Sequence, residues 1–226
     1  MKKMIIRRIE AEKYEVAEAM DTLCTNLSLA GDGIKKIVVT STRPMEGKSF
    51  VCMNMLRTVA GLGKKVVLLD ADVRASRLQY DYKIKIVSDG DAYLGLNGYL
   101  SGQCGVDEII YETNIQGADV ILAGEKVSDS FQRLDTERLS NLLDHLSSQY
   151  DFVIIDTPPI GVVIDAVKIA RYCDGVVFVV GSGSVTASSL ESAVHQIYKS
   201  GCPVLGYVLN KAESMNRNKY GAYYGK

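Results

Sequence analysis

The sequence predicts an α/β protein with a doubly wound, mostly parallel sheet flanked by helices. Short runs of β-branched and other apolar residues recur along the chain. They are apolar on both faces, as strands of a parallel sheet covered by helices must be. Longer segments with helical spacing separate these runs, and such alternation is typical of doubly wound folds. With 226 residues and 47% hydrophobic side chains, the chain is long enough to bury a continuous core.

The expected elements follow one another in regular order. A helix at about residues 11–29 precedes the first strand, Ile37–Thr40. Further strands are expected at Val66–Leu69, Val120–Leu122, Phe152–Ile155, Val176–Val180 and Val204–Leu209, and further helices at Lys48–Leu62, Thr136–Ser148 and Val185–Lys199. Residues 1–210 are therefore predicted to form one domain. Residues 211–226 are polar, basic and rich in tyrosine, so we expect a flexible, disordered tail that cannot bury enough apolar surface to order itself.

Composition narrows the possible functions. The 26 basic and 27 acidic residues leave a net charge of −1, which argues against a nucleic-acid binder. The five cysteines are scattered and have no metal-ligand spacing, which argues against a zinc site or a disulfide framework and favours a reducing cytosol. No segment is typical of a signal peptide or a membrane-spanning helix. We therefore expect a cytoplasmic protein that reaches the membrane only through a partner.

The first strand leads into the segment STRPMEGKS, residues 41–49, and a helix follows. This strand–loop–helix context is the one that a phosphate-binding P-loop requires. Backbone N–H groups would surround the phosphates, Lys48 would neutralise them, and the Ser49 hydroxyl would bind Mg²⁺. Met45 stands where a glycine is common, and a left-handed conformation there would cost about 1–2 kcal/mol. The predicted nucleotide-binding residues of the loop are Thr42, Arg43, Pro44, Met45, Glu46, Gly47, Lys48, Ser49 and Phe50.

Two further strands end in aspartates. Asp70 and Asp72 follow the strand Val66–Leu69, and Asp156 follows Phe152–Ile155. The carboxyl ends of parallel strands meet at one edge of the sheet, where ligands bind. A single aspartate there is often only a turn or capping residue. Beside a P-loop, we instead expect the magnesium ligands Ser49, Asp70 and Asp156, and the catalytic residues Lys48, Asp70 and Asp72.

These motifs, in this order, resemble those of the bacterial tyrosine kinases of capsule and exopolysaccharide synthesis, a P-loop NTPase family. Residues 41–49 resemble its Walker A motif, Asp70–Arg74 its second Walker motif, and Asp156–Pro159 its Walker B motif. Further similarity lies in Gly95–Gly102, in Gly206–Lys211, and in the tyrosines at the end of the chain. The similarity covers nearly the whole chain.

The resemblance implies a Mg-ATP-dependent autokinase that phosphorylates the tail of another copy of itself, with Asn210 near the adenine. It implies the phosphoacceptors Tyr220, Tyr223 and Tyr224, ATP and Mg²⁺ as cofactors, and control of capsule or exopolysaccharide synthesis and export. It also implies the split form of the family, in which a separate membrane-spanning adaptor recruits the kinase to the inner face of the membrane. Asp21 and Cys24 replace two arginines with which the family packs its subunits into a ring.

Two other functions remain open from the sequence. A MinD/ParA-type ATPase switch would share the P-loop and the strand-end aspartates, but it has no need of a tyrosine-rich tail. A catalytically weak partner-binding module would explain the two replaced arginines and Met45. Incubation with Mg-ATP separates these hypotheses: a kinase gains phosphate, a switch releases ADP without gaining phosphate, and a binding module does neither.

Overall fold

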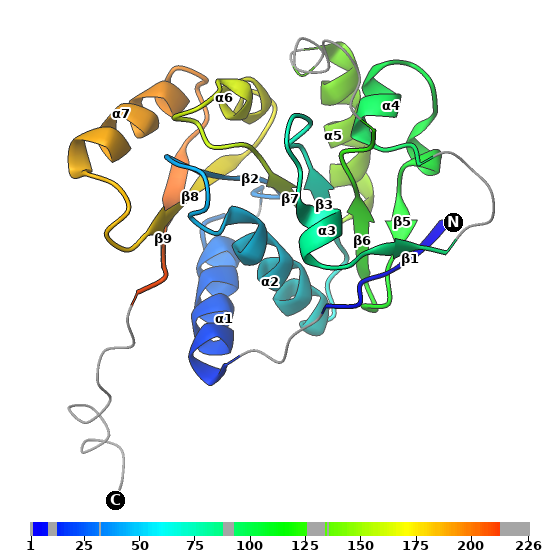
Figure 1. Cartoon of the computed structure of the whole chain (residues 1–226), viewed down its shortest axis with the longest axis horizontal. Coiled ribbons are helices and arrows are strands. Elements are labelled where there is room, and N and C mark those ends of the chain that lie inside the picture. Colours follow the sequence, from blue (N-terminus) through cyan, green and yellow to red (C-terminus); the bar gives the residue numbers. More distant parts are fainter. Residues whose placement is uncertain are drawn as a thin grey trace, which may run out of the picture.

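The computed structural model describes residues 2–8, 13–31, 33–87, 93–125, 134 and 136–212. Its described strands form one sheet in the order β4-β1-β5-β6-β3-β7-β2-β8-β9 (Figure 1). The strands are β1 (Lys2–Ile5), β2 (Lys36–Ser41), β3 (Val66–Asp70), β4 (Lys85–Ile86), β5 (Tyr111–Glu112), β6 (Ala118–Ile121), β7 (Phe152–Asp156), β8 (Gly175–Gly181) and β9 (Val204–Asn210). The helices are α1 (Tyr14–Leu29), α2 (Lys48–Gly61), α3 (Leu78–Asp81), α4 (Leu96–Leu100), α5 (Glu137–Gln149), α6 (Asp165–Ala170) and α7 (Ala187–Tyr198), with a 3₁₀ turn at Val106–Glu108.

The six strands from β6 to β9 across the sheet are all parallel to one another, which confirms the predicted fold class. Alternate residues along each strand enter two different cores. In β3, Val67 and Leu69 pack with α5, α6 and α7, whereas Val66 and Leu68 pack with α1 and α2. Helices therefore cover both faces of the sheet (Figure 1), as the doubly apolar strands require.

The central strands lie where the sequence predicts them, with ends that differ by at most two residues. The short elements β1, β4, β5, α3, α4 and α6 were not predicted, because two to six residues are too few to show a periodicity. The predicted helix at 11–29 is described from Tyr14 onward. Most of the predicted tail, residues 213–226, lies outside the described residues.

Strand register brings the predicted site together. Asp70 of β3 pairs with Asp156 of β7, and Val39 of β2 pairs with the same Asp156. The loop between β2 and α2 therefore begins on the strand next to Asp156 and two strands from Asp70, at the carboxyl edge of the sheet. This edge is where ligands bind in open α/β sheets.

Within the described ranges, no helix combines the length and the apolar character needed to cross a membrane.

Candidate nucleotide-binding site

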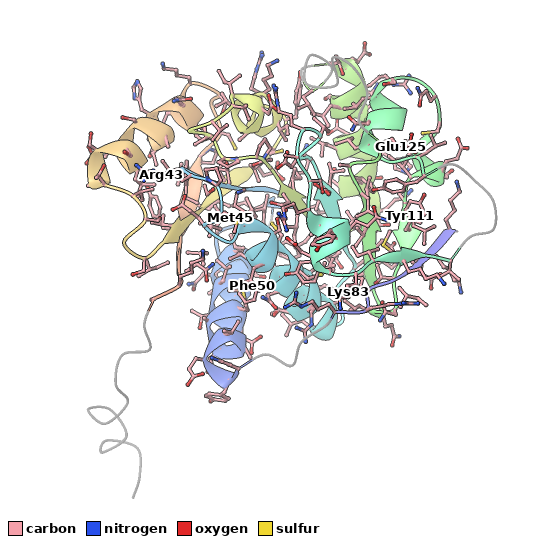
Figure 2. The ribbon with its side chains drawn as sticks, viewed as in Figure 1. Arg43, Met45, Phe50, Lys83, Tyr111 and Glu125 are labelled. Carbon is pink, nitrogen blue, oxygen red and sulfur yellow. The ribbon has the colours of Figure 1, made fainter. Side chains whose placement is uncertain are left out.

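The loop between β2 and α2 holds two residues in the left-handed region. Met45 has a φ of 65° and Gly47 a φ of 98°. A Cβ atom on Gly47 would lie 2.0 Å from the amide nitrogen of Asn210, so only glycine fits there. Met45 does carry the strained backbone considered above, at a cost of about 1–2 kcal/mol, and its side chain is 77% exposed (Figure 2). The sequence can identify Gly47 as required by the loop, whereas Met45 is tolerated.

Glu46 fastens the loop to the neighbouring strand. Its Oε2 atom accepts a 2.7 Å hydrogen bond from the backbone N–H of Arg43. Its Oε1 atom accepts from the backbone N–H of Gly181 at 2.9 Å and from the Ser184 hydroxyl. Burial alone would raise the pKa of Glu46, but these hydrogen bonds outweigh it and hold the pKa below its usual value. The carboxylate therefore points into the protein, and only the backbone of this predicted nucleotide-binding residue is left to face a phosphate.

The end of β9 packs against the same loop. The amide nitrogen of Asn210 donates to the carbonyl of Glu46 at 2.8 Å, and the ammonium of Lys211 donates to the carbonyl of Met45 at 2.6 Å. These bonds satisfy two loop carbonyls that would otherwise compete with the N–H groups for the space around a bound anion. Asn210, which resemblance places near the adenine, thus contacts the phosphate-binding loop itself.

Asp70 and Asp156 form a buried acidic pair. They are 1% and 3% exposed and pair in register across β3 and β7. Burial and the neighbouring Asp156 carboxylate raise the pKa of Asp70 to about 8, although the Ser76 hydroxyl donates to it. Burial also raises the pKa of Asp156 to about 6, opposed by the Ser49 hydroxyl and the charge of Lys48.

This pair fits a divalent cation. The Oδ1 atom of Asp156 is buried and has no hydrogen-bond partner among the residues that the structure describes. Two carboxylates whose ionisation is disfavoured by burial and by each other gain most from a nearby cation, and Mg²⁺ prefers oxygen ligands such as carboxylates and hydroxyls. The predicted ligands Ser49, Asp70 and Asp156 therefore supply a suitable donor set.

The loop after β3 is held at a position that the sequence did not reveal. Arg74 donates from Nε to Oδ2 of Asp165 at 2.6 Å and from Nη2 to Oδ1 at 3.1 Å. Asp165 is fully buried at the start of α6. Asp72 lies half-buried in the same loop, where its Oδ1 accepts from the N–H of Ala75 at 2.9 Å. An acid in the first turn of a helix usually only interacts favourably with the helix dipole, so nothing in the sequence indicates that Asp165 supports this loop.

A pocket of about 910 Å³ opens at the start of α2. It brings together the predicted residues Pro44, Met45, Gly47, Lys48, Ser49, Phe50, Asp72 and Asp156. Thr42 and Arg43 instead line a smaller cavity of about 320 Å³ against α7. Asp70, Glu46 and Asn210 do not line this pocket. They make the contacts described above. The predicted acceptors Tyr220, Tyr223 and Tyr224 lie outside the described residues.

The fold and this loop define the class of the protein as a P-loop NTPase. Residues 34–200 match the model of a family described as "AAA domain". The MinD protein of Pyrococcus horikoshii, solved with Mg-ADP, shares the fold with a TM-score of 0.65 at 22% identity, covering 81% of this chain and 73% of that one. This class binds nucleotides on its P-loop.

Other known proteins are more similar to this chain than MinD is, in sequence identity and in TM-score. The tyrosine-protein kinase CpsD of Streptococcus pneumoniae is 34% identical over 222 residues, which are 96% of this chain and 93% of the relative. The chimerical protein CapA2B2 has a TM-score of 0.82 at 28% identity, with 93% of both chains covered. The kinase domain of the Escherichia coli tyrosine kinase ETK has a TM-score of 0.78 at 27% identity, covering 88% and 78%. The chain therefore belongs to the bacterial tyrosine kinases, within the MinD/ParA-like P-loop class.

Proposed function

We propose that this protein-tyrosine kinase uses Mg-ATP to phosphorylate the C-terminal tyrosines of another copy of itself. The observation that carries the proposal is one pocket in which Lys48 and Ser49 of the loop face Asp72 and Asp156 of the strand ends. Phosphoryl transfer needs carboxylates that hold a cation, here Asp70 and Asp156, and a separate, more accessible carboxylate, here Asp72.

Each residue of the site would have its own role in phosphoryl transfer. Lys48 and the loop N–H groups would bind the β- and γ-phosphates, while Ser49, Asp70 and Asp156 would hold Mg²⁺. The ion supplies charge neutralisation to the phosphates. The tyrosine oxygen forms a bond to the γ-phosphorus, the bond from that phosphorus to the β,γ-bridging oxygen breaks, and ADP leaves. Asp72, the accessible carboxylate, would take the tyrosine proton or orient the hydroxyl.

The acceptors proposed are Tyr220, Tyr223 and Tyr224. They fall within the last seven residues, together with Gly221 and Gly225, whose backbones are permissive. The resemblance of this segment to the tyrosine cluster of the family supports transfer between copies. We further propose that the protein acts in the control of capsule or exopolysaccharide synthesis, as the name of a relative encoded in a "cps region" suggests. A membrane-spanning adaptor would recruit it from the cytoplasm, and the chimerical construction of CapA2B2 is compatible with such a partner.

A mixing experiment tests transfer between copies. One variant, Lys48→Met, keeps the tail but loses the phosphate-binding charge; the other has all three tail tyrosines replaced by phenylalanine but keeps the site. The two are given tags of different mass, incubated separately and together with Mg-ATP, and measured as intact proteins. We expect phosphate on the Lys48→Met chain only in the mixture, at up to three groups per chain.

The same incubation distinguishes an ATPase switch from a kinase. Release of ADP with no gain in mass of either chain would support a MinD-like switch. Phosphate that appears on the triple phenylalanine variant at the wild-type level would show that the acceptor lies elsewhere in the chain.

A further inference from the structure

The pocket carries an apolar surface beside its phosphate-binding and acidic residues. Pro159, Val162 and Val163 follow β7, and all three line the pocket together with Lys48 and Asp72. We refer to Pro159, Val162 and Val163 as the apolar wall. Val162 is 61% exposed, so its methyl groups are open to contact. Apolar side chains that line a pocket next to a few polar groups are suited to the apolar part of a ligand.

The apolar wall is fixed to the phosphate-binding loop. The N–H of Gly161 donates to the carbonyl of Thr42 at 3.2 Å. A Cβ atom on Gly161 would lie 2.3 Å from that carbonyl oxygen, so only glycine allows this close approach. The N–H groups of Val162 and Val163 both donate to the carbonyl of Pro159, at 3.0 and 3.2 Å, and close a turn. The wall therefore has a defined position relative to the loop that would hold the phosphates.

The apolar wall also lies beside the segment that carries Asp72. Arg74 follows Asp72 by two residues, and Asp165 follows Val163 by two. The 2.6 Å bond between Nε of Arg74 and Oδ2 of Asp165 joins the two segments at these points. The strands that lead into them, β3 and β7, are neighbours in the sheet. Asp72 and the apolar wall are therefore close together on one side of the pocket.

A second apolar surface lines the pocket on another side. It consists of Met45 of the loop and Phe50 at the start of α2, which are 77% and 42% exposed (Figure 2). The bond from Lys211 to the Met45 carbonyl places this surface toward β9, whereas the segment of Asp72 leads to α3. Figure 1 shows β9 and α3 on opposite sides of α2. The pocket thus has two apolar surfaces, and Mg-ATP and a tyrosine together bring two aromatic rings.

We propose that the apolar wall binds the ring of the acceptor tyrosine and so helps to select tyrosine as the substrate. This rests on the proposed function, in which Asp72 takes the tyrosine proton or orients the hydroxyl. A tyrosine side chain has an apolar body and a polar tip. Its ring can therefore lie against Val162 and Val163 while its oxygen reaches Asp72, and the adenine occupies the side of Phe50.

The apolar wall favours tyrosine over serine and threonine for two reasons. Contact between the ring and the valine methyl groups removes apolar area from water, which a short hydroxyl side chain cannot match. The ring also carries its hydroxyl farther from the backbone than serine or threonine does. With the acceptor backbone outside the wall, a serine oxygen would stop short of Asp72. The preference for tyrosine therefore has a hydrophobic and a geometric part.

The mixture of tagged chains described above provides the first test. The acceptor is the full Lys48→Met chain. The enzyme is the chain with Tyr220, Tyr223 and Tyr224 replaced by phenylalanine, with or without Val162→Ala. We expect Val162→Ala in the enzyme to raise the KM for the acceptor chain at least about fivefold. Because the ring contact is the same in the ground state and the transition state, kcat and the KM for ATP should stay within about twofold.

Two further variants are matched controls. Ile164→Ala shortens an apolar side chain that is 56% exposed but does not line the pocket, and it should leave the acceptor KM unchanged. Val162→Ile keeps an apolar, β-branched side chain in the wall and should retain the wild-type acceptor KM. The inference is overturned if Val162→Ala raises the KM for ATP instead, or if Val162→Ala and Ile164→Ala have equal acceptor KM values.

Binding distinguishes failure of this inference from failure of the proposed function. The full chain is labelled at its valine and isoleucine methyl groups for nuclear magnetic resonance and saturated with Mg-ADP. N-acetyl-tyrosinamide should shift the signals of Val162 and Val163 but not those of Ile164, and N-acetyl-serinamide, which has no ring, should shift none of them. If the shifts appear but no phosphate reaches the Lys48→Met chain, transfer between copies is wrong and the ring subsite stands. If phosphate is transferred but the shifts do not appear, the subsite is wrong and the proposed function stands.

Discussion

Asp156 ends β7 and Asp72 follows β3, and the surroundings of the two differ. Asp156 is buried beside Ser49 and Lys48, where a cation and the phosphates would lie, whereas Asp72 is half-buried in the following loop. We predict that Asp72→Asn lowers the single-turnover rate of transfer about 10²–10⁴-fold while ATP affinity stays within a few fold. Asp156→Asn should lower both. Equal loss of ATP binding in the two variants, measured by titration, would contradict this division of roles.

Asp70 makes the metal-free protein sensitive to pH. Its pKa in the folded state is about 8, well above the ordinary aspartate value of 3.8, because it is buried next to Asp156. The unfolded chain loses this proton near pH 4 while the folded chain retains it, so the group contributes stability below about pH 4 and that contribution is lost as the pH rises toward 8. The sign is opposite to that of a salt-bridged aspartate.

Replacement of Asp70 by asparagine tests this reasoning. In the absence of Mg²⁺ and nucleotide, Asp70→Asn should raise the stability at pH 8 by about 1–2 kcal/mol, and the melting temperature by roughly 2–8 °C, with little gain at pH 5. The same variant should lose kinase activity, because it lacks the cation ligand. Parallel curves of melting temperature against pH for wild type and variant would argue against an effect of Asp70 ionisation.

At the scale of elements, α1 packs on α2 through Met20, Cys24 and Leu27, which are spaced four and three residues apart. Cys24 is 2% exposed, and burial raises the pKa of its thiol to about 12, so it is a neutral core residue. Asp21 is exposed on the same helix. The two positions that carry arginine in the family are therefore not equivalent in this chain.

A charge at each position should have a different cost. Cys24→Arg would bury a guanidinium against the α2 core, and we expect it to destabilise the fold by about 3 kcal/mol or more. Asp21→Arg, its matched control, should change stability by less than about 0.5 kcal/mol. Urea unfolding followed by circular dichroism measures both. Similar stabilities for the two variants would mean that α1 separates from α2 at little cost.

At the scale of the whole molecule, ligand binding at the carboxyl edge of the sheet should raise the free energy of unfolding. The site draws residues from the loop after β2 and from the ends of β3, β7 and β9, so a ligand there stabilises only the folded chain. At 100 times its dissociation constant, Mg-ADP should add about 2.7 kcal/mol, or roughly 5–10 °C in the melting temperature. Removal of Mg²⁺ by a chelator should abolish most of this shift, and Lys48→Met should reduce it. A shift that is unchanged by the chelator would place the nucleotide away from Asp70 and Asp156.

The sequence alone determined the doubly wound class, the central strands and the loop with its strand-end aspartates. These features are local: a strand buried on both faces must be apolar on both, and a phosphate-binding loop must place Gly47 and Lys48 between a strand and a helix. Parallel strands then bring Asp70 and Asp156 to one edge without any knowledge of side-chain packing.

The tertiary structure decided the rest, because it depends on contacts between residues far apart in the chain. Glu46 lies within the loop motif, but its partners Gly181 and Ser184 come from β8 and the turn after it, and they turn its carboxylate away from the phosphates. Asp165 supports Arg74 across 91 residues of sequence. These pairings leave no periodicity and no motif in the sequence, so only the folded chain shows which side chains meet.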